Sequence, residues 1–136
     1  MNPLQANELA QFARKYRFAG GRIRSLKLQI AQKALTLHTK LVVQKAMKDL
    51  SGDSPRVMLK LQLESVEEYR FQKRLNMVAG RMTDFRIGYF NGTFFLNFDA
   101  WEIPPGETPA IHDFRASDAY VVGSRLFWEE VSKPQS

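Results

Sequence analysis

The segment 81–101 constrains the fold most, because it is typical of a β-hairpin centred on Asn91-Gly92. A two-residue type I′ turn needs positive φ at both central positions, and Asn-Gly tolerates this best. Strand side chains alternate with period two, so a register that pairs Phe90 with Thr93 places three further pairs on one face. We predict that this face belongs to the core, with the pairs Tyr89–Phe94, Ile87–Leu96 and Phe85–Phe98.

The opposite face of this hairpin brings two carboxylates together. The same register sets Asp84 against Asp99 and Arg86 against Asn97. Opposed side chains have Cβ atoms about 5 Å apart, and like charges so placed are destabilising unless something neutralises them. We favour a surface salt-bridge cluster with Arg86 or Arg81. A divalent metal site for magnesium or calcium and acid–base catalysis by the two carboxylates remain open alternatives.

Residues 3–18 predict one N-terminal helix. Asn2 and Pro3 suit the N-cap and first helical positions, and Gly20-Gly21 is expected to end the helix. Apolar residues recur at the three- and four-residue steps of a helical stripe, namely Ala6, Leu9, Phe12, Ala13 and Tyr16.

Residues 22–48 predict two strands, because apolar and polar side chains alternate from Leu26 to Ile30 and again from Leu35 to Val43. A helical stripe through the same residues remains an alternative, although the β-branched residues favour strands. Residues 57–64 alternate more regularly and predict a third strand, followed by a bulge or bend near residues 65–68.

Residues 114–128 allow two interpretations. Tyr120 and Val122, then a Gly123-Ser124 turn, then Leu126, predict a second hairpin, which we favour. Alternatively, Ser117 caps a helix.

Together, the predicted elements indicate a single domain over residues 1–136, with a strand-rich core at 22–131 and a frayed tail at 132–136. We expect a mainly β, antiparallel, sandwich-like or open-barrel fold of about six or seven strands with one N-terminal helix.

Several classes of chemistry lack their usual residues. The chain has no cysteine and only two histidines, which disfavours disulfides, thiolate sites and histidine-rich metal sites. Neither a phosphate-binding P-loop nor a dinucleotide glycine fingerprint occurs. His112 and Asp113 lie close to Ser117, but without a nucleophile elbow or oxyanion loop this spacing does not indicate a triad. We expect no cofactor and no catalytic residue of these types.

The N-terminus shows no signal-peptide pattern, and no apolar run approaches the roughly 20 residues that cross a bilayer. We therefore expect a cytoplasmic, soluble protein without a membrane partner.

The net charge of +6 is unevenly distributed, since residues 1–50 hold ten basic and only two acidic residues. Basic residues interleaved with aromatic ones form a candidate nucleic-acid or other polyanion site at Arg14, Lys15, Arg17, Arg22, Arg24 and Lys27. We favour the alternative, in which Tyr16 and Phe18 pack the helix onto the sheet and the cations form a solvated rim.

A third candidate surface lies in residues 67–74, where charges of both signs flank two aromatics. Tyrosine and arginine are frequent anchors of protein interfaces, so we predict partner binding by Tyr69, Arg70, Phe71 and Arg74. An edge strand guarded by charge against aggregation is the alternative. The leading functional expectation is a non-enzymatic interaction module with a protein partner. Polyanion binding and metal-dependent catalysis at Asp84 and Asp99 are the alternatives, and edge strands make a homodimer possible.

Overall fold

The computed structural model describes residues 1–31, 33–47, 52, 54–71, 82, 84–98, 110–115 and 119–131. Arg74, Asp99 and the predicted tail 132–136 lie outside this part of the chain. The described elements follow in the order β1 (Asn2–Leu4), η1 (Ala6–Glu8), α1 (Leu9–Lys15), β2 (Tyr16–Ala31), β3 (Ala34–Lys45), β4 (Arg56–Glu64), β5 (Glu68–Phe71), β6 (Arg86–Phe90), β7 (Thr93–Asn97), α2 (Ile111–Arg115), β8 (Ala119–Gly123) and β9 (Arg125–Val131).

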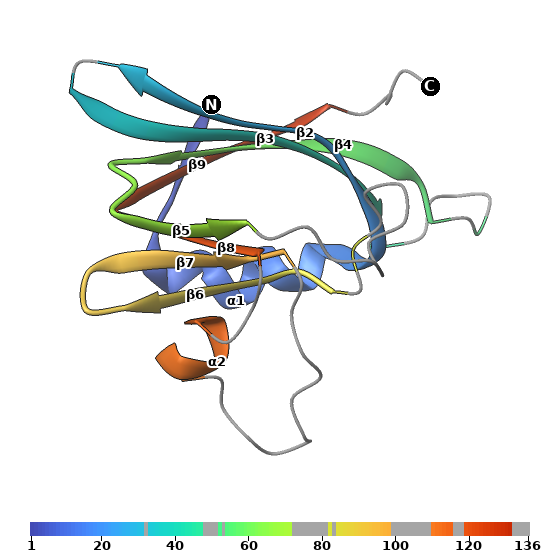
Figure 1. Cartoon of the computed structure of the whole chain (residues 1–136). Coiled ribbons are helices and arrows are strands. Elements are labelled where there is room, and N and C mark those ends of the chain that lie inside the picture. The colour runs from blue at the N-terminus through green and yellow to red at the C-terminus, as the bar shows by residue number, and fades with distance from the viewer. Residues whose placement is uncertain are drawn as a thin grey trace.

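The strands form two antiparallel sheets that lie face to face, as Figure 1 shows. The larger sheet has the order β1-β9-β4-β3-β2, and the smaller one the order β5-β8-β7-β6. The predicted fold class, a mainly β sandwich-like domain with a helix near the N-terminus, is confirmed. The described residues form nine strands instead of six or seven, and one of them, β1, comes from residues that the helix was predicted to contain.

The central hairpin has the predicted register. Both turn residues have a positive φ, as a type I′ turn requires, with 51° at Asn91 and 82° at Gly92. The recorded pairs include Tyr89 with Phe94 and Ile87 with Leu96. Phe94 and Leu96 are buried as predicted. The core prediction is wrong for Tyr89, which is 41% exposed beside the turn, although its ring packs edge-on against Phe94 at 4.8 Å between centroids.

The other face of the hairpin is also covered near the turn, where the register places Phe90 and Phe95. Phe95 and Phe114 are buried there in a second apolar cluster, against which Phe90 packs. Helix α2 supplies Phe114 and covers this side of the small sheet (Figure 1). Gly88 permits the contact, because a Cβ at this position would lie 2.7 Å from the Phe114 ring. The small sheet therefore has apolar packing on both faces.

The N-terminal helix is shorter than predicted. Asn2 and Pro3 belong to β1, which pairs with β9, and the helix α1 ends at Lys15. Tyr16 has extended backbone (φ −129°, ψ 147°) and pairs with Lys45, so sheet hydrogen bonding overrides the helical periodicity at this end. Gly20 and Gly21 do not end the helix as predicted, because they form a bulge inside β2.

The strand interpretation of residues 22–48 is confirmed, and its helical alternative is wrong. Alternate residues of β3 are buried between the sheets, as in a half-buried strand, and they are Leu37, Thr39, Leu41 and Val43. The alternate residues of β4 are buried in the same way, and they are Val57, Leu59, Leu61 and Leu63. The buried Thr39 hydroxyl donates to the Ser25 carbonyl oxygen at 2.8 Å. This bond satisfies the polar group of Thr39 inside the core.

The predicted bend at residues 65–68 is confirmed, and it joins the two sheets. The ladder between β4 and β9 continues around this corner into the ladder between β5 and β8. Ser65 has a positive φ of 55°. The Ser124 amide donates to the Glu64 carbonyl oxygen at 3.0 Å, and the Glu67 amide donates to the Val122 oxygen at 2.9 Å. Backbone hydrogen bonds therefore persist through the bend.

Both β8 and β9 are strands, so the helical alternative for this region is wrong. The predicted hairpin between them is also wrong, because they lie in different sheets and do not pair with one another. Gly123 stands at the inside of the corner instead of in a tight turn. A Cβ there would lie 2.6 Å from Leu63 Cγ and 2.8 Å from the Glu64 carbonyl oxygen.

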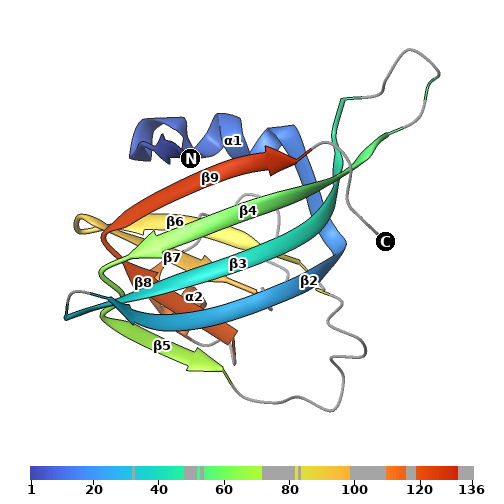
Figure 2. The same cartoon turned by 90° about the horizontal axis from the view of Figure 1, so that it is seen from above.

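Figure 2 shows how the two long sides of the sandwich differ. Helix α1 runs along the side of β9 and β6, where Phe12 packs edge-on against Trp128 at 5.3 Å between ring centroids. Strands β2 and β5, which end the two sheets, bound the opposite side. Within the described residues, no helix has the length and apolar character that crossing a membrane requires.

We expect Gly123→Ala to lower the free energy of unfolding by about 1–3 kcal/mol, the usual cost of overpacking a rigid site. The neighbouring substitution Ser124→Ala is the control, because Ser124 is exposed at the same corner. Urea unfolding followed by circular dichroism compares the two variants. Equal midpoints for both would show that the corner does not depend on glycine.

Candidate functional site

The structure places the six cations of the predicted polyanion site in three groups. Arg14 and Lys15 belong to the last turn of α1 and line a groove between this helix and β9. Arg17 and Arg22 line a hollow at the β2 bulge. The remaining two, Arg24 and Lys27, lie farther along β2.

The hollow at the bulge contains three arginines. Its volume is about 240 Å³, and Arg56 from β4 joins Arg17 and Arg22 in its lining. Arg17 pairs with Gln44 on β3, and Gln44 pairs with Arg56, so all three strands contribute to one row. Among the described residues, no carboxylate lines this hollow.

The groove beside α1 has a volume of about 660 Å³ and contains a partly buried polar contact. The Tyr16 hydroxyl donates to Glu130 Oε1 at 2.7 Å, and Lys45 Nζ lies 3.1 Å from Glu130 Oε2. Burial and the adjacent Glu130 carboxylate raise the pKa of Tyr16 well above its ordinary value of 10.0. Lys15 Nζ lies 5.4 Å from the centre of the Trp128 ring, which is the geometry of a cation–π contact. Lys15 and Lys45 thus each have a partner in this groove.

Tyr16 and Phe18 are only 5% and 7% exposed. Neither ring is therefore available to stack on a base. Phe18 packs against Phe85 with 5.0 Å between centroids, and Tyr16 packs against Phe12 at 5.4 Å. This arrangement agrees with the packing alternative for the two aromatics.

The predicted partner strand β5 lies at the edge of the small sheet. Tyr69 and Phe71 are 53% and 36% exposed, and their ring centroids are 6.2 Å apart. Phe71 also contacts Phe98, which is fully buried, so the exposed pair continues the apolar core at the sheet edge. Arg74, the fourth predicted residue of this surface, lies outside the described residues.

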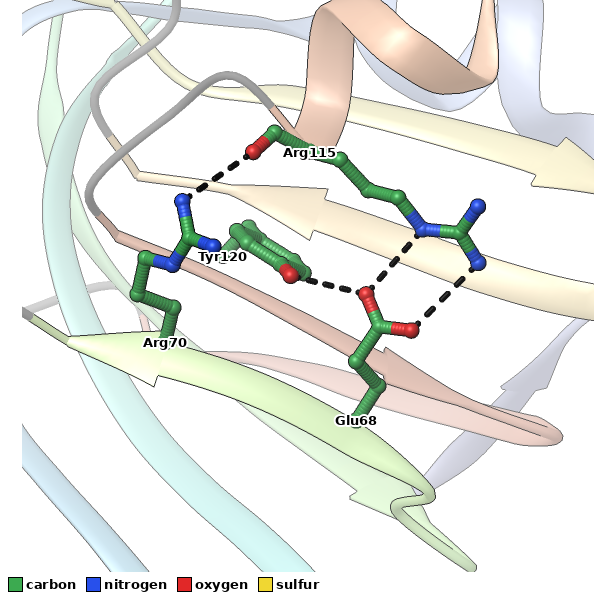
Figure 3. A network of polar contacts seen from close by, with 4 residues as sticks. All are labelled: Glu68, Arg70, Arg115 and Tyr120. Atoms are coloured by element: carbon green, nitrogen blue, oxygen red, sulfur yellow. Dashed lines mark hydrogen bonds and ion pairs between the residues drawn. The ribbon is translucent and has the colours of Figure 1, made fainter.

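Arg70 points to the other face of β5, where it joins the polar network drawn in Figure 3. Its guanidinium lies 5.6 Å from the Tyr120 ring centre and donates to the Arg115 carbonyl oxygen at 3.4 Å. Arg115 makes two hydrogen bonds to the Glu68 carboxylate, at 3.1 Å and 3.3 Å. The Tyr120 hydroxyl donates to Glu68 Oε2 at 2.7 Å. The network links β5, β8 and α2.

The hydrogen bond from Tyr120 and the charge of Arg115 favour the ionised form of the Glu68 carboxyl. Together they hold the pKa of Glu68 below its usual 4.5. Burial and the same hydrogen bond raise the pKa of Tyr120 above 10.0. The network therefore joins an ionised carboxylate to a protonated tyrosine and an arginine, and it holds α2 against the small sheet.

The predicted metal residues are not found together in the described structure, since Asp99 lies outside it. Asp84 Oδ1 accepts a hydrogen bond from the Phe85 amide at 2.8 Å, and Arg86 Nε lies 3.3 Å from Oδ2. Asp84 is thus engaged in the Arg86 ion pair that the salt-bridge alternative predicted. The described residues contain no cluster of three or more histidines or carboxylates suited to a metal ion.

A second groove of about 670 Å³ runs between α1 and the edge strand β6. Its walls are mostly apolar and include Leu9, Ile87 and Phe90, while Arg17 and the Asp84–Arg86 pair supply its charges. The groove lies on the α1 side of the sandwich, across the molecule from β5. The sequence pattern gives no sign of this groove, because its walls come from segments far apart in the chain.

Of the three residues with triad-like spacing, the structure describes the side chain of Asp113 alone. Asp113 Oδ2 accepts a hydrogen bond from the Ala110 amide at 2.7 Å. This is a capping contact at the start of α2. Ser117 and the side chain of His112 lie outside the described part.

Comparison of the chain with protein-family models, with curated proteins and with solved structures gives no significant match.

We expect Tyr120→Phe to lower the free energy of unfolding by about 1 kcal/mol near neutral pH, because Glu68 loses a hydrogen bond. The pKa of Glu68 is lowered in the folded state from its ordinary value of 4.5. The stabilisation is therefore fully present at pH values above 4.5, and it is lost as the pH falls through the lowered pKa that Glu68 has in the folded protein. Urea unfolding at about pH 7 and about pH 3 measures the difference.

Tyr69→Phe is the matched control, since the Tyr69 hydroxyl has no hydrogen bond among the described residues. A stability loss in Tyr120→Phe that stays the same at both pH values would contradict the assignment to the Glu68 carboxylate.

Proposed function

We propose that this chain is a non-enzymatic interaction module, and that its partner is a protein with an acidic segment next to apolar side chains. The observation that carries this proposal is the exposed aromatic pair Tyr69 and Phe71 on the edge strand β5. Tyrosine and phenylalanine bury large areas at low cost in conformational entropy, and interfaces are enriched in them.

The neighbouring edge strand β2 supports the same surface. Ile30 of β2 is 82% exposed. Ile30 pairs with Leu35, and the Leu35 carbonyl oxygen accepts the Val66 amide at 2.8 Å, just before β5 begins. Figure 2 shows β2 and β5 along the same side of the sandwich. The exposed Ile30 of β2 and the beginning of β5 therefore lie at the same end of the molecule.

Charge favours an acidic partner over a second copy of the chain. Strand β2 carries Arg22, Arg24 and Lys27 along this side. Two copies that paired through β2 would bring like charges together, which is unfavourable. An acidic segment would be attracted, and its association rate would fall as salt screens the charges.

The polar network behind β5 supports a preformed surface. Arg70 is held by Tyr120 and by the Arg115 carbonyl oxygen, so β5 is tied to β8 and α2 on its far face. A strand that is already ordered loses less entropy on binding.

The alternative of metal-dependent catalysis at Asp84 is not favoured, because the Asp84 carboxylate forms an ion pair with Arg86.

Photo-crosslinking tests the proposal. We expect p-benzoylphenylalanine in place of Tyr69 to give a discrete protein adduct in cells that express the chain. The same replacement of Tyr89 should give none, because Tyr89 is comparably exposed but belongs to β6, the opposite edge. Adducts at position 89 alone, or at neither position, would contradict the proposal.

The cross-linked partner can then be purified for binding measurements. Tyr69→Ala is expected to weaken its binding by about tenfold or more, the size typical of an interface anchor, whereas Tyr89→Ala should leave it nearly unchanged. Lys27→Glu should slow association and flatten its salt dependence. Equal losses in Tyr69→Ala and Tyr89→Ala would place the interface elsewhere.

A further inference from the structure

We propose that the hollow formed by Arg17, Arg22 and Arg56 is a binding site for an oxyanion of the phosphate class. The lining of this hollow includes no residue of β5, although the site shares Arg22 with the basic side of β2 described above. Three cations surround a hollow of about 240 Å³, and no carboxylate is found among the described residues of its lining. Among the described residues, none of these three guanidinium groups forms an ion pair or hydrogen bond.

The bulge in β2 creates the hollow. Arg17 pairs with Gln44 and Arg22 pairs with Val42, so the four residues between the arginines oppose the single residue Val43. The extra chain bends β2 and brings two arginines that are five positions apart to the same side. In a regular strand, such residues would point to opposite faces.

Two glycines shape the floor of the hollow. Gly20 has a φ of 79°, a value that other residues rarely adopt. Gly21 lies close to β3, since a Cβ there would be 2.9 Å from the Val42 carbonyl oxygen. The Gly20 amide donates to the Met82 carbonyl oxygen at 3.0 Å, and the Met82 amide donates to the Gly21 oxygen at 2.8 Å. These two bonds fix the bulge, so the hollow is preformed.

The register between β3 and β4 places Arg56, the third arginine, beside the hollow. Gln44 lies between Arg17 and Arg56 in one row across β2, β3 and β4. Neighbouring strands are about 4.8 Å apart, so the two arginines at the ends of the row start about 10 Å from one another. Their side chains can meet over an anion placed above Gln44, whose amide is a further donor.

The chemistry of the lining selects the class of ligand. Guanidinium groups bind phosphate oxygens in pairs through their fork of N–H donors. Three of them suit a compact group with two negative charges better than a single carboxylate. The described part of the lining contains no aromatic side chain. A strand of nucleic acid would need stacking platforms of that kind, so a single phosphate group fits better than a polynucleotide.

Titration with inorganic phosphate and pyrophosphate tests the site, with chloride at matched ionic strength as the reference. The variants are Arg17→Gln, Arg22→Gln and Arg56→Gln. Matched controls are Lys27→Gln and Lys40→Gln, which remove one exposed positive charge each from the same sheet outside the hollow. Arg56→Lys keeps the charge but removes the fork. Thermal unfolding without ligand first verifies that each variant is folded.

We expect pyrophosphate at about 10 mM to raise the unfolding temperature of the unchanged chain, because a ligand that binds only the folded state stabilises it. Each arginine variant, including Arg56→Lys, should weaken pyrophosphate binding by about tenfold, and the lysine controls by less than about twofold. In NMR spectra, the amide signals of Gly20 and Gly21 should shift with pyrophosphate.

Two results would overturn the proposal. One is the absence of pyrophosphate binding at low ionic strength, and the other is an equal loss of pyrophosphate affinity in the lysine controls and the arginine variants. A third arm uses a single-stranded DNA oligomer. If the oligomer binds more tightly than pyrophosphate and Lys27→Gln weakens it as much as Arg56→Gln does, the cations form a general polyanion surface, and the phosphate site is rejected.

Discussion

The bent ladder in which β4 and β5 pair with β9 and β8 is the constraint on which the rest of the structure depends. Within the described residues, this ladder runs continuously from one sheet into the other, so the position of one sheet over the other follows from the geometry of its corner. Gly123 lets Leu63 approach from the inside, and the amide of Ser124 keeps its partner on Glu64. Each strand that pairs farther out inherits this placement.

The elements with a local cause could be predicted from the sequence. The turn at Asn91-Gly92 needs only two adjacent residues, and alternation from Val57 to Leu63 is a property of one strand. The end of the helix could not be predicted, because Tyr16 leaves it in order to pair with Lys45, a residue far away in the chain. The supposed hairpin at Gly123 failed for the same kind of reason, since Leu63 and Glu64 determine what that glycine does.

The candidate sites follow the same division. Tyr69 and Phe71 could be identified from one segment, because an exposed aromatic pair on an edge strand needs only a local pattern. Arg56 could not be assigned to a basic site, since it meets Arg17 only through two successive strand pairings. The contact of Tyr120 with Glu68 likewise depends on which strands become neighbours. Pairing between strands that are distant in the chain cannot be recognised from the amino-acid composition around either residue.

The pairing of β1 with β9 has a consequence for how the chain folds. Asn2 lies opposite Trp128, and Leu4, which is buried in the core, lies opposite Leu126. An edge of the larger sheet therefore closes only when its first and last strands meet. During synthesis, the N-terminal segment leaves the ribosome long before its partner exists. Such non-local contacts give a high contact order, which slows folding, and the larger sheet becomes complete only after residue 128 has emerged.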